Sequence, residues 1–129
     1  MRDDLQLGAL ETRVMELLWH EPSGASARDV LARLGRRPRL AYTTIQTTLD
    51  RLYRKRMLRR VRDGRAHRYF AALSHDDYQR LATREALSPL LQENPHTVLA
   101  AFVDVAAELD DDALDELEAL IAARRRAET

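Results

Sequence analysis

The fold is decided by two neighbouring stretches, residues 42–55 (YTTIQTTLDRLYRK) and residues 58–71 (LRRVRDGRAHRYFA). The first has an apolar stripe at helical spacing, made of Tyr42, Ile45, Leu49 and Leu52, which predicts an amphipathic helix. The second has Asp63-Gly64 between two extended runs. That arrangement is typical of a β-hairpin, because glycine accepts the positive φ of a tight turn. The sequence therefore predicts a helix followed by a hairpin.

Two further helices are expected before this pair. Apolar residues at helical spacing predict the first over residues 8–20, and the cluster EPSG at residues 21–24 ends it. Ser26 and Asp29 have the spacing of a capping box and begin the second, which Gly35 and Pro38 are placed to close. Three helices followed by a hairpin are the layout of a winged helix-turn-helix domain, which we expect over residues 1–73.

The remaining residues, 74–129, are expected to be helical. Ser74 and Asp77 begin one helix, which Ser88-Pro89 should kink or end because proline disfavours helical geometry in the residue before it. Asn94-Pro95 begins a second helix, and the three aspartates at 110–112 begin a third. The predicted fold class is mainly α with a small β-hairpin wing, in which a C-terminal helical region follows the winged-helix domain.

The formal net charge of zero hides a marked asymmetry along the chain. Residues 1–80 carry 17 Arg and Lys against 10 Asp and Glu, whereas residues 81–129 carry 4 against 11. Residues 35–68 concentrate 12 basic side chains, 11 of them arginine, against two acids. Composition alone does not distinguish a basic half that binds a polyanion from two solvated faces of opposite charge. Because the basic segment coincides with the expected third helix and hairpin, we favour binding to a nucleic acid, whose phosphates release counterions on contact.

Three sets of side chains are candidate DNA contacts. The first set lies in the first turns of the third helix and is expected to reach base edges, thymine methyls or nearby phosphates. It consists of Thr43, Thr44, Gln46 and Thr47. Those expected to contact the phosphate backbone from later in that helix are Arg51, Arg54 and Lys55. Those expected to contact phosphate or the minor groove from the wing are Arg62, Arg65, His67 and Arg68.

The acidic C-terminal region has long apolar faces and would repel DNA. We expect it to form a homodimer, which places two reading helices on a dyad site, through Leu99, Phe102, Val103, Leu114, Leu117, Leu120 and Ile121. The alternative is that these helices fold back onto the winged helix of the same chain.

Several classes of protein are not expected. The chain has no cysteine, and its four histidines are scattered without a pair at one-turn spacing, so we expect neither a metal site nor a cofactor. No catalytic motif is visible, which argues against an enzyme. No apolar run has the length of a signal peptide or a membrane span, so a cytoplasmic protein without membrane insertion is expected.

Three stretches resemble the penicillinase-repressor family, the BlaI/MecI group to which the copper-responsive CopY repressors are related. They are residues 7–19 (LGALETRVMELLW), residues 43–52 (TTIQTTLDRL), and residues 63–65 (DGR) followed by Tyr69. The most specific elements are the patterns V-M-x-x-L-W and T-I-x-T-x-L-x-R-L. The tail around Phe102 and the acidic start of the last helix are also similar to the family.

The resemblance implies a dimeric transcriptional repressor that binds palindromic operators in double-stranded DNA. It also implies release through a membrane-bound metalloprotease sensor that cleaves an Asn-Phe bond in the tail. The corresponding bond here is Ala101–Phe102, so the asparagine is missing. The cysteine cluster with which CopY binds metal is absent as well. The competing hypothesis is a winged-helix adaptor that binds an acidic protein and has no sequence-specific DNA binding.

Overall fold

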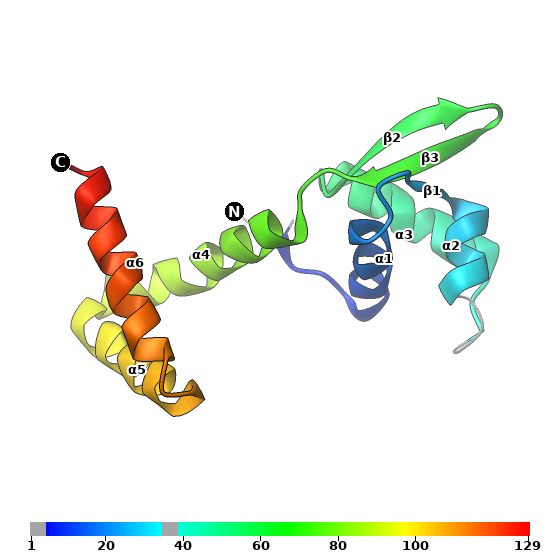
Figure 1. The fold of residues 1–129 in the computed structure, drawn as a ribbon. Helices are drawn as coiled ribbons and strands as arrows, with labels where there is room; N and C mark the ends of the chain where they lie inside the picture. The colour runs from blue at the N-terminus through cyan, green and yellow to red at the C-terminus, as the bar shows by residue number, and fades with distance from the viewer. Residues whose placement is uncertain (1–4, 35–38) are drawn as a thin grey trace. The chain divides into compact units, whose positions relative to one another are not determined.

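The computed structural model describes residues 5–34 and 39–129. In chain order its elements are α1 (Ala9–Trp19), β1 (Ala25–Ser26), α2 (Ala27–Leu34), α3 (Tyr42–Arg54), β2 (Leu58–Asp63), β3 (Ala66–Ala71), α4 (His75–Glu93), α5 (Pro95–Leu109) and α6 (Ala113–Ala127) (Figure 1). The expected fold class, mainly α with a hairpin wing, is confirmed. The end of α2, where Gly35 and Pro38 were expected to act, lies outside the described residues.

The chain divides into two compact units, the first extending to Glu85 and the second running from Ala86 to Thr129. The expected boundary after residue 73 falls inside the first unit. The start of α4 belongs there because the Tyr78 hydroxyl donates a hydrogen bond to the Leu5 carbonyl (2.7 Å) and its ring packs against the core. None of the described helices has the length and apolar character needed to cross a membrane.

The core of the first unit lies between α1, α2, α3 and the sheet. Its largest fully buried side chains are Val14, Met15, Val30, Ile45, Leu49, Leu52 and Met57. Three of them, Ile45, Leu49 and Leu52, belong to α3 and anchor one face of that helix. Of the stripe expected there, Tyr42 is only half-buried, and Thr48 is buried in addition.

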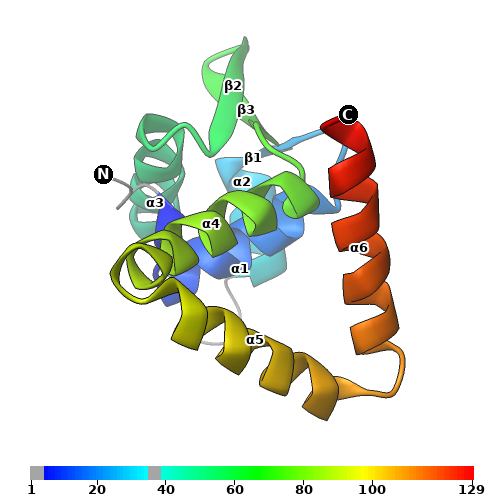
Figure 2. The same ribbon diagram turned by 90° about the vertical axis from the view of Figure 1, so that its left-hand side faces the viewer.

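Among the residues that the structure describes, the sheet has three antiparallel strands in the order β1-β3-β2. β2 and β3 form the wing, which projects from the helices in Figure 2. The two-residue strand β1 pairs with β3 and is too short for hydrophobic alternation to reveal it. Gly24, just before β1, has φ +76°, and a Cβ there would lie 2.7 Å from the Tyr69 carbonyl oxygen. A glycine is therefore required where the chain enters this strand.

The wing turn is shifted by one residue from the expected position. The last strand pair is Asp63 with Ala66, so the two turn residues are Gly64 and Arg65. Gly64 has φ +66°, which supplies the positive φ of a tight hairpin turn. The shift puts Arg65 at the tip of the wing.

The capping box expected at the start of α2 is present. The Ser26 backbone N–H donates to Asp29 Oδ2 (3.0 Å), and the Asp29 N–H donates to Ser26 Oγ (3.1 Å). The bond from the Ser26 N–H lowers the pKa of the Asp29 carboxyl from its ordinary value. Of the two outcomes expected at Ser88-Pro89, an end of the helix is wrong, because α4 passes through Pro89 and ends at Glu93. One proline removes one backbone hydrogen bond of the ladder without ending it.

Candidate nucleic-acid interface

The first turns of α3 present a polar face to solvent. Thr43, Thr44, Gln46 and Thr47 are all exposed, as expected for groups that must reach a partner. Because the opposite face is fixed in the core by fully buried Ile45 and Leu49, these side chains are held outward on a rigid helix. Thr48 differs from them: its hydroxyl donates to the Thr44 carbonyl (2.8 Å) and it is buried.

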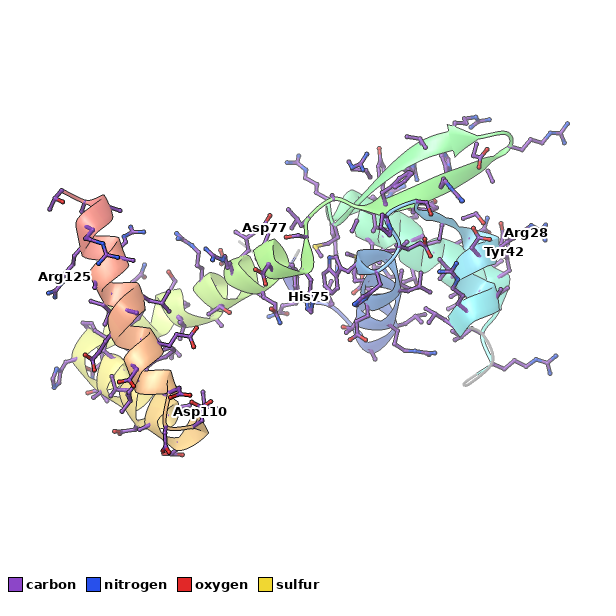
Figure 3. All side chains as sticks on the ribbon, in the orientation of Figure 1. Arg28, Tyr42, His75, Asp77, Asp110 and Arg125 are labelled. Atoms are coloured by element: carbon purple, nitrogen blue, oxygen red, sulfur yellow. The ribbon has the colours of Figure 1, made fainter. Side chains whose placement is uncertain are left out.

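Tyr42, at the start of α3, contacts a basic residue of α2. The Arg28 guanidinium lies 5.6 Å from the centroid of the Tyr42 ring, a cation–π distance. Figure 3 labels both residues, which lie together at this end of the first unit. Sequence reasoning did not single out Arg28. It is exposed, and it adds a positive charge beside the polar face of α3.

The basic residues later in α3 differ in how they are engaged. Arg51 is exposed. Arg54 is also exposed, and its Nε donates to Asp50 Oδ2 (2.9 Å) one helical turn earlier. Lys55, in contrast, is bound within the protein: its Nζ donates to the Gln6 carbonyl and to Glu11 Oε1, each at 3.0 Å. A phosphate contact by Lys55 would have to compete with these two bonds.

The partner of Lys55 is a buried carboxylate. Glu11 is 7% exposed and also accepts a hydrogen bond from the Gly8 backbone N–H (2.9 Å), which caps α1. Burial would raise the pKa of Glu11, but the bonds from Gly8 and Lys55 outweigh it and lower the pKa below its ordinary value. Sequence reasoning missed this ion pair, although Glu11 three residues after Gly8 has capping spacing.

The four expected wing residues do not form one surface. Arg62 and Arg65 are exposed, whereas His67 and Arg68 are half-buried. Arg62 and His67 are paired across the strands, and Arg68, one residue on, points to the opposite face because side chains alternate along a strand. There Arg68 Nη1 lies 3.4 Å from Asp29 Oδ2 of α2. Arg68 therefore ties the wing to α2.

A cleft of about 270 Å³ separates α3 from the wing. Its lining residues are Ala27, Tyr42, Gln46, Asp50, Arg65, Ala66, His67 and Tyr69. Gln46 and Arg65 thus share one cleft, although 19 positions separate them in the sequence. Gln46 is the residue expected to contact base edges, and Arg65 is expected to contact phosphate or the minor groove.

One network at this surface was not anticipated from the sequence. Asp50 Oδ1 lies 3.3 Å from Nη1 of Arg60 on β2, while its other oxygen binds Arg54. The Arg60 guanidinium lies 3.8 Å from the centroid of the Tyr53 ring. Burial acts to lower the pKa of Arg60, but hydrogen bonds to Tyr69 and Asp50 raise it overall. Only the spacing of Asp50 and Arg54 could have been read from the sequence.

Metal-ligating groups do not gather in the part of the chain that the structure describes. Within residues 5–34 and 39–129, no three side chains of His, Asp or Glu lie close enough together to hold a metal ion. The surface of α3 and the wing instead offers hydroxyl, amide and guanidinium groups, which are hydrogen-bonding partners of phosphates and base edges.

Comparison with known proteins gives consistent matches. The family model described as penicillinase repressor matches residues 7–123. The transcriptional regulator BlaI of Mycobacterium tuberculosis (strain H37Rv) is 42% identical over 72 residues, 56% of this chain and 52% of that protein. The match thus spans about half the length of that relative. The methicillin resistance regulatory protein MecI of Staphylococcus aureus (strain N315) is 21% identical over 116 residues, 90% of this chain and 93% of MecI.

A solved structure supports the assignment of the first unit. The solution structure of the DNA binding domain of the repressor BlaI matches with a TM-score of 0.52 and 28% sequence identity. The match covers 60% of this chain and 94% of that domain. The winged-helix fold expected from the order of helices and hairpin is confirmed.

Proposed function

Because this chain belongs to the penicillinase repressor family, we propose that it represses transcription by binding palindromic operator sites in double-stranded DNA as a homodimer. The observation that carries the proposal is the surface shared by α3 and the wing, where exposed Gln46 and Arg65 line one cleft. A rigid helix with a short polar face beside an arginine-tipped hairpin suits a major groove and its flanking phosphates.

In this proposal α3 reads sequence with its first turns. Gln46 can bond an adenine edge through two hydrogen bonds. Thr43, Thr44 and Thr47 can contact phosphates through their hydroxyls or thymine methyls through their own methyl groups. Arg51 and Arg54 contact the backbone further along the helix. Lys55 contributes mainly by holding the N-terminal segment against α3, because both of its acceptors lie within the protein.

In the same proposal the wing contributes contacts to the phosphate backbone or the minor groove. Arg65 at the turn and Arg62 on β2 are exposed, so their guanidinium groups are available to phosphate or to the minor groove. His67 lines the cleft and is proposed to lie near the DNA strand that the wing contacts. Arg68 faces away from the cleft and contributes through its contact with Asp29.

The second unit is proposed to form the homodimer. Of residues 86–129 only Ala106 is buried, so this pair of packed helices has almost no core of its own. Its exposed apolar side chains include Leu99, Phe102, Val103, Leu114, Leu120 and Ile121, and Leu117 is half-buried. A patch of this kind marks an association surface. A second copy is the proposed occupant, because a dyad operator needs two reading helices.

Release from the operator is proposed to follow a signal that acts on this tail, with a membrane-bound metalloprotease sensor as the candidate partner. The candidate bond, Ala101–Phe102, lies inside α5, and Phe102 is 47% exposed. Cleavage there would require α5 to open locally before a protease could bind the chain.

Substitution of Gln46 and of Arg65 tests whether Gln46 contacts bases and Arg65 contacts the phosphate backbone. We expect Arg65→Ala to weaken binding to all duplexes alike and to reduce the salt slope by about one unit. We expect Gln46→Ala to relax base preference at one position, equivalent to about 1–3 kcal/mol. Fluorescence anisotropy with a selected duplex and single-base variants of it measures both effects.

Exposed residues of α4 provide matched controls. Gln79→Ala and Arg80→Ala make the same chemical changes outside α3 and the wing, and should leave affinity and base preference close to those of the wild type. If Gln46→Ala and Arg65→Ala behave like these controls, the proposed surface is wrong. Equal binding of the wild type to all sequences would favour the adaptor hypothesis instead.

A further inference from the structure

Asp50 is an acidic side chain on the surface that is proposed to meet DNA. It lies on α3 one turn after Gln46 and lines the same cleft. A carboxylate in this position repels phosphates and reduces the affinity that the neighbouring arginines provide. Its presence therefore needs a physical explanation other than attraction to DNA.

The contacts of Asp50 connect two separate elements. One carboxylate oxygen binds Arg54 on α3 at 2.9 Å, and the other lies 3.3 Å from Arg60 on β2. The Asp50 side chain is 42% exposed and that of Arg60 is 26% exposed, so this second pair is only partly open to solvent. The carboxylate thus joins the helix to the base of the wing.

Arg60 has further contacts that join α3 to the wing. Its guanidinium lies 3.8 Å from the centroid of the Tyr53 ring, which also belongs to α3. Arg60 is paired in register with Tyr69 of β3, a buried residue of the core. Two contacts to α3 and one strand pairing therefore fix Arg60, and with it the start of the wing, relative to the reading helix.

We propose that Asp50 is a positioning residue for DNA recognition. It fixes the wing and Arg54 relative to α3, and it lowers the sequence-independent affinity for DNA. The inference rests on the proposed function, because it concerns how that surface discriminates between sequences. In physical terms, a carboxylate held between two arginines lowers the affinity for any phosphate backbone. It increases the difference between the correct duplex and all others, because Gln46 and Arg65 are kept at a fixed separation.

The charge effect and the positioning effect of Asp50 have opposite signs for the selected duplex, so they can be separated. Asp50→Asn removes the charge and keeps the shape. We expect its affinity for a scrambled duplex to rise, with a salt slope steeper by about one unit. We expect the ratio of selected-duplex to scrambled-duplex affinity to fall about tenfold.

Asp63→Asn is the matched control, because Asp63 is an exposed acid at the far end of β2. It removes one negative charge from the wing without touching the contact between α3 and β2. Affinity for both duplexes should rise together, and their ratio should stay at the wild-type value.

Arg60→Gln supplies a second route to the same prediction. It should also lower the affinity ratio, although Arg60 is not among the proposed DNA contacts. The double variant Asp50→Asn/Arg60→Gln should be little worse than either single variant, since both substitutions break one interaction. Circular dichroism melting of each variant identifies the temperature range in which the titrations report on folded protein.

The experiment uses the full chain, a duplex selected from a random pool by the wild type, and a scrambled duplex of equal composition. A fall in the ratio for Asp50→Asn, but not for Asp63→Asn, supports positioning. If Asp50→Asn raises both affinities as Asp63→Asn does, or lowers both equally, the inference is overturned while the proposed function stands. If the wild type itself shows no preference for its selected duplex, the proposed function fails and the inference fails with it.

Discussion

At the scale of single residues, the ion pair between Glu11 and Lys55 links three parts of the first unit. Glu11 belongs to α1, Lys55 follows α3, and Gln6 in the N-terminal segment accepts a second bond from Lys55. The Glu11 carboxylate is buried, so losing its partners would leave a charge without compensation. The position of the C-terminal end of α3 therefore depends on a charge that titrates in acid.

Stability should depend on pH through Glu11. The pKa of Glu11 is lowered from 4.5 in the folded chain, so its contribution is complete above that value and is lost as the pH falls through the folded pKa. Glu11→Gln should lower the free energy of unfolding by about 2 kcal/mol at pH 7. The difference from the wild type should shrink at pH 3.

Urea denaturation of both proteins at the two pH values measures this effect. Glu16→Gln is the control, because Glu16 lies exposed on the same helix and its loss should change stability by less than about 0.5 kcal/mol. A loss of equal size at pH 7 and pH 3 would contradict the role assigned to the Glu11 charge.

At the scale of elements, helical periodicity predicted which face of α3 is exposed, because Ile45, Leu49 and Leu52 are buried on the opposite face. It did not predict that Thr48 is buried as well. The pairs Lys55–Glu11, Asp50–Arg60 and Arg68–Asp29 could not be predicted. Each ion pair joins elements that only the tertiary fold brings together. The same reason hides β1, which is a strand only because β3 lies beside it. The wing turn was predicted to within one residue from Asp63-Gly64 alone.

The entry into β1 gives a prediction about glycine. Gly24→Ala should destabilise the first unit by more than about 2 kcal/mol, since it combines a positive φ with a Cβ 2.7 Å from Phe70 and from the Tyr69 carbonyl. Gly64→Ala should lose only about 1 kcal/mol, because its φ is also positive but nothing lies within 4 Å of the new atom. Thermal melting of the two variants compares them directly, and equal losses would show that the close approach of β3 to Gly24 is not significant.

At the scale of the whole molecule, the two units differ in charge and in burial. The first contains the buried core and the basic surface, whereas residues 86–129 carry 10 acidic against 3 basic side chains and one buried residue. The resemblance to penicillinase repressors, based on the motifs around Trp19 and in α3, is confirmed by a match over residues 7–123. The contacts of Tyr78 that join the start of α4 to the first unit are tertiary, so the sequence does not reveal them.

We propose that two copies of this chain read a dyad in DNA with α3, while the wings contact the phosphate backbone. The direct test of this proposal is to select duplexes from a random pool with the wild-type chain and then to sediment the protein together with the enriched duplex. We predict an inverted repeat, with half-sites separated by about one helical turn or a multiple of it, and two chains bound to each duplex. Enrichment of no sequence, or of a single half-site bound by one chain, would contradict it.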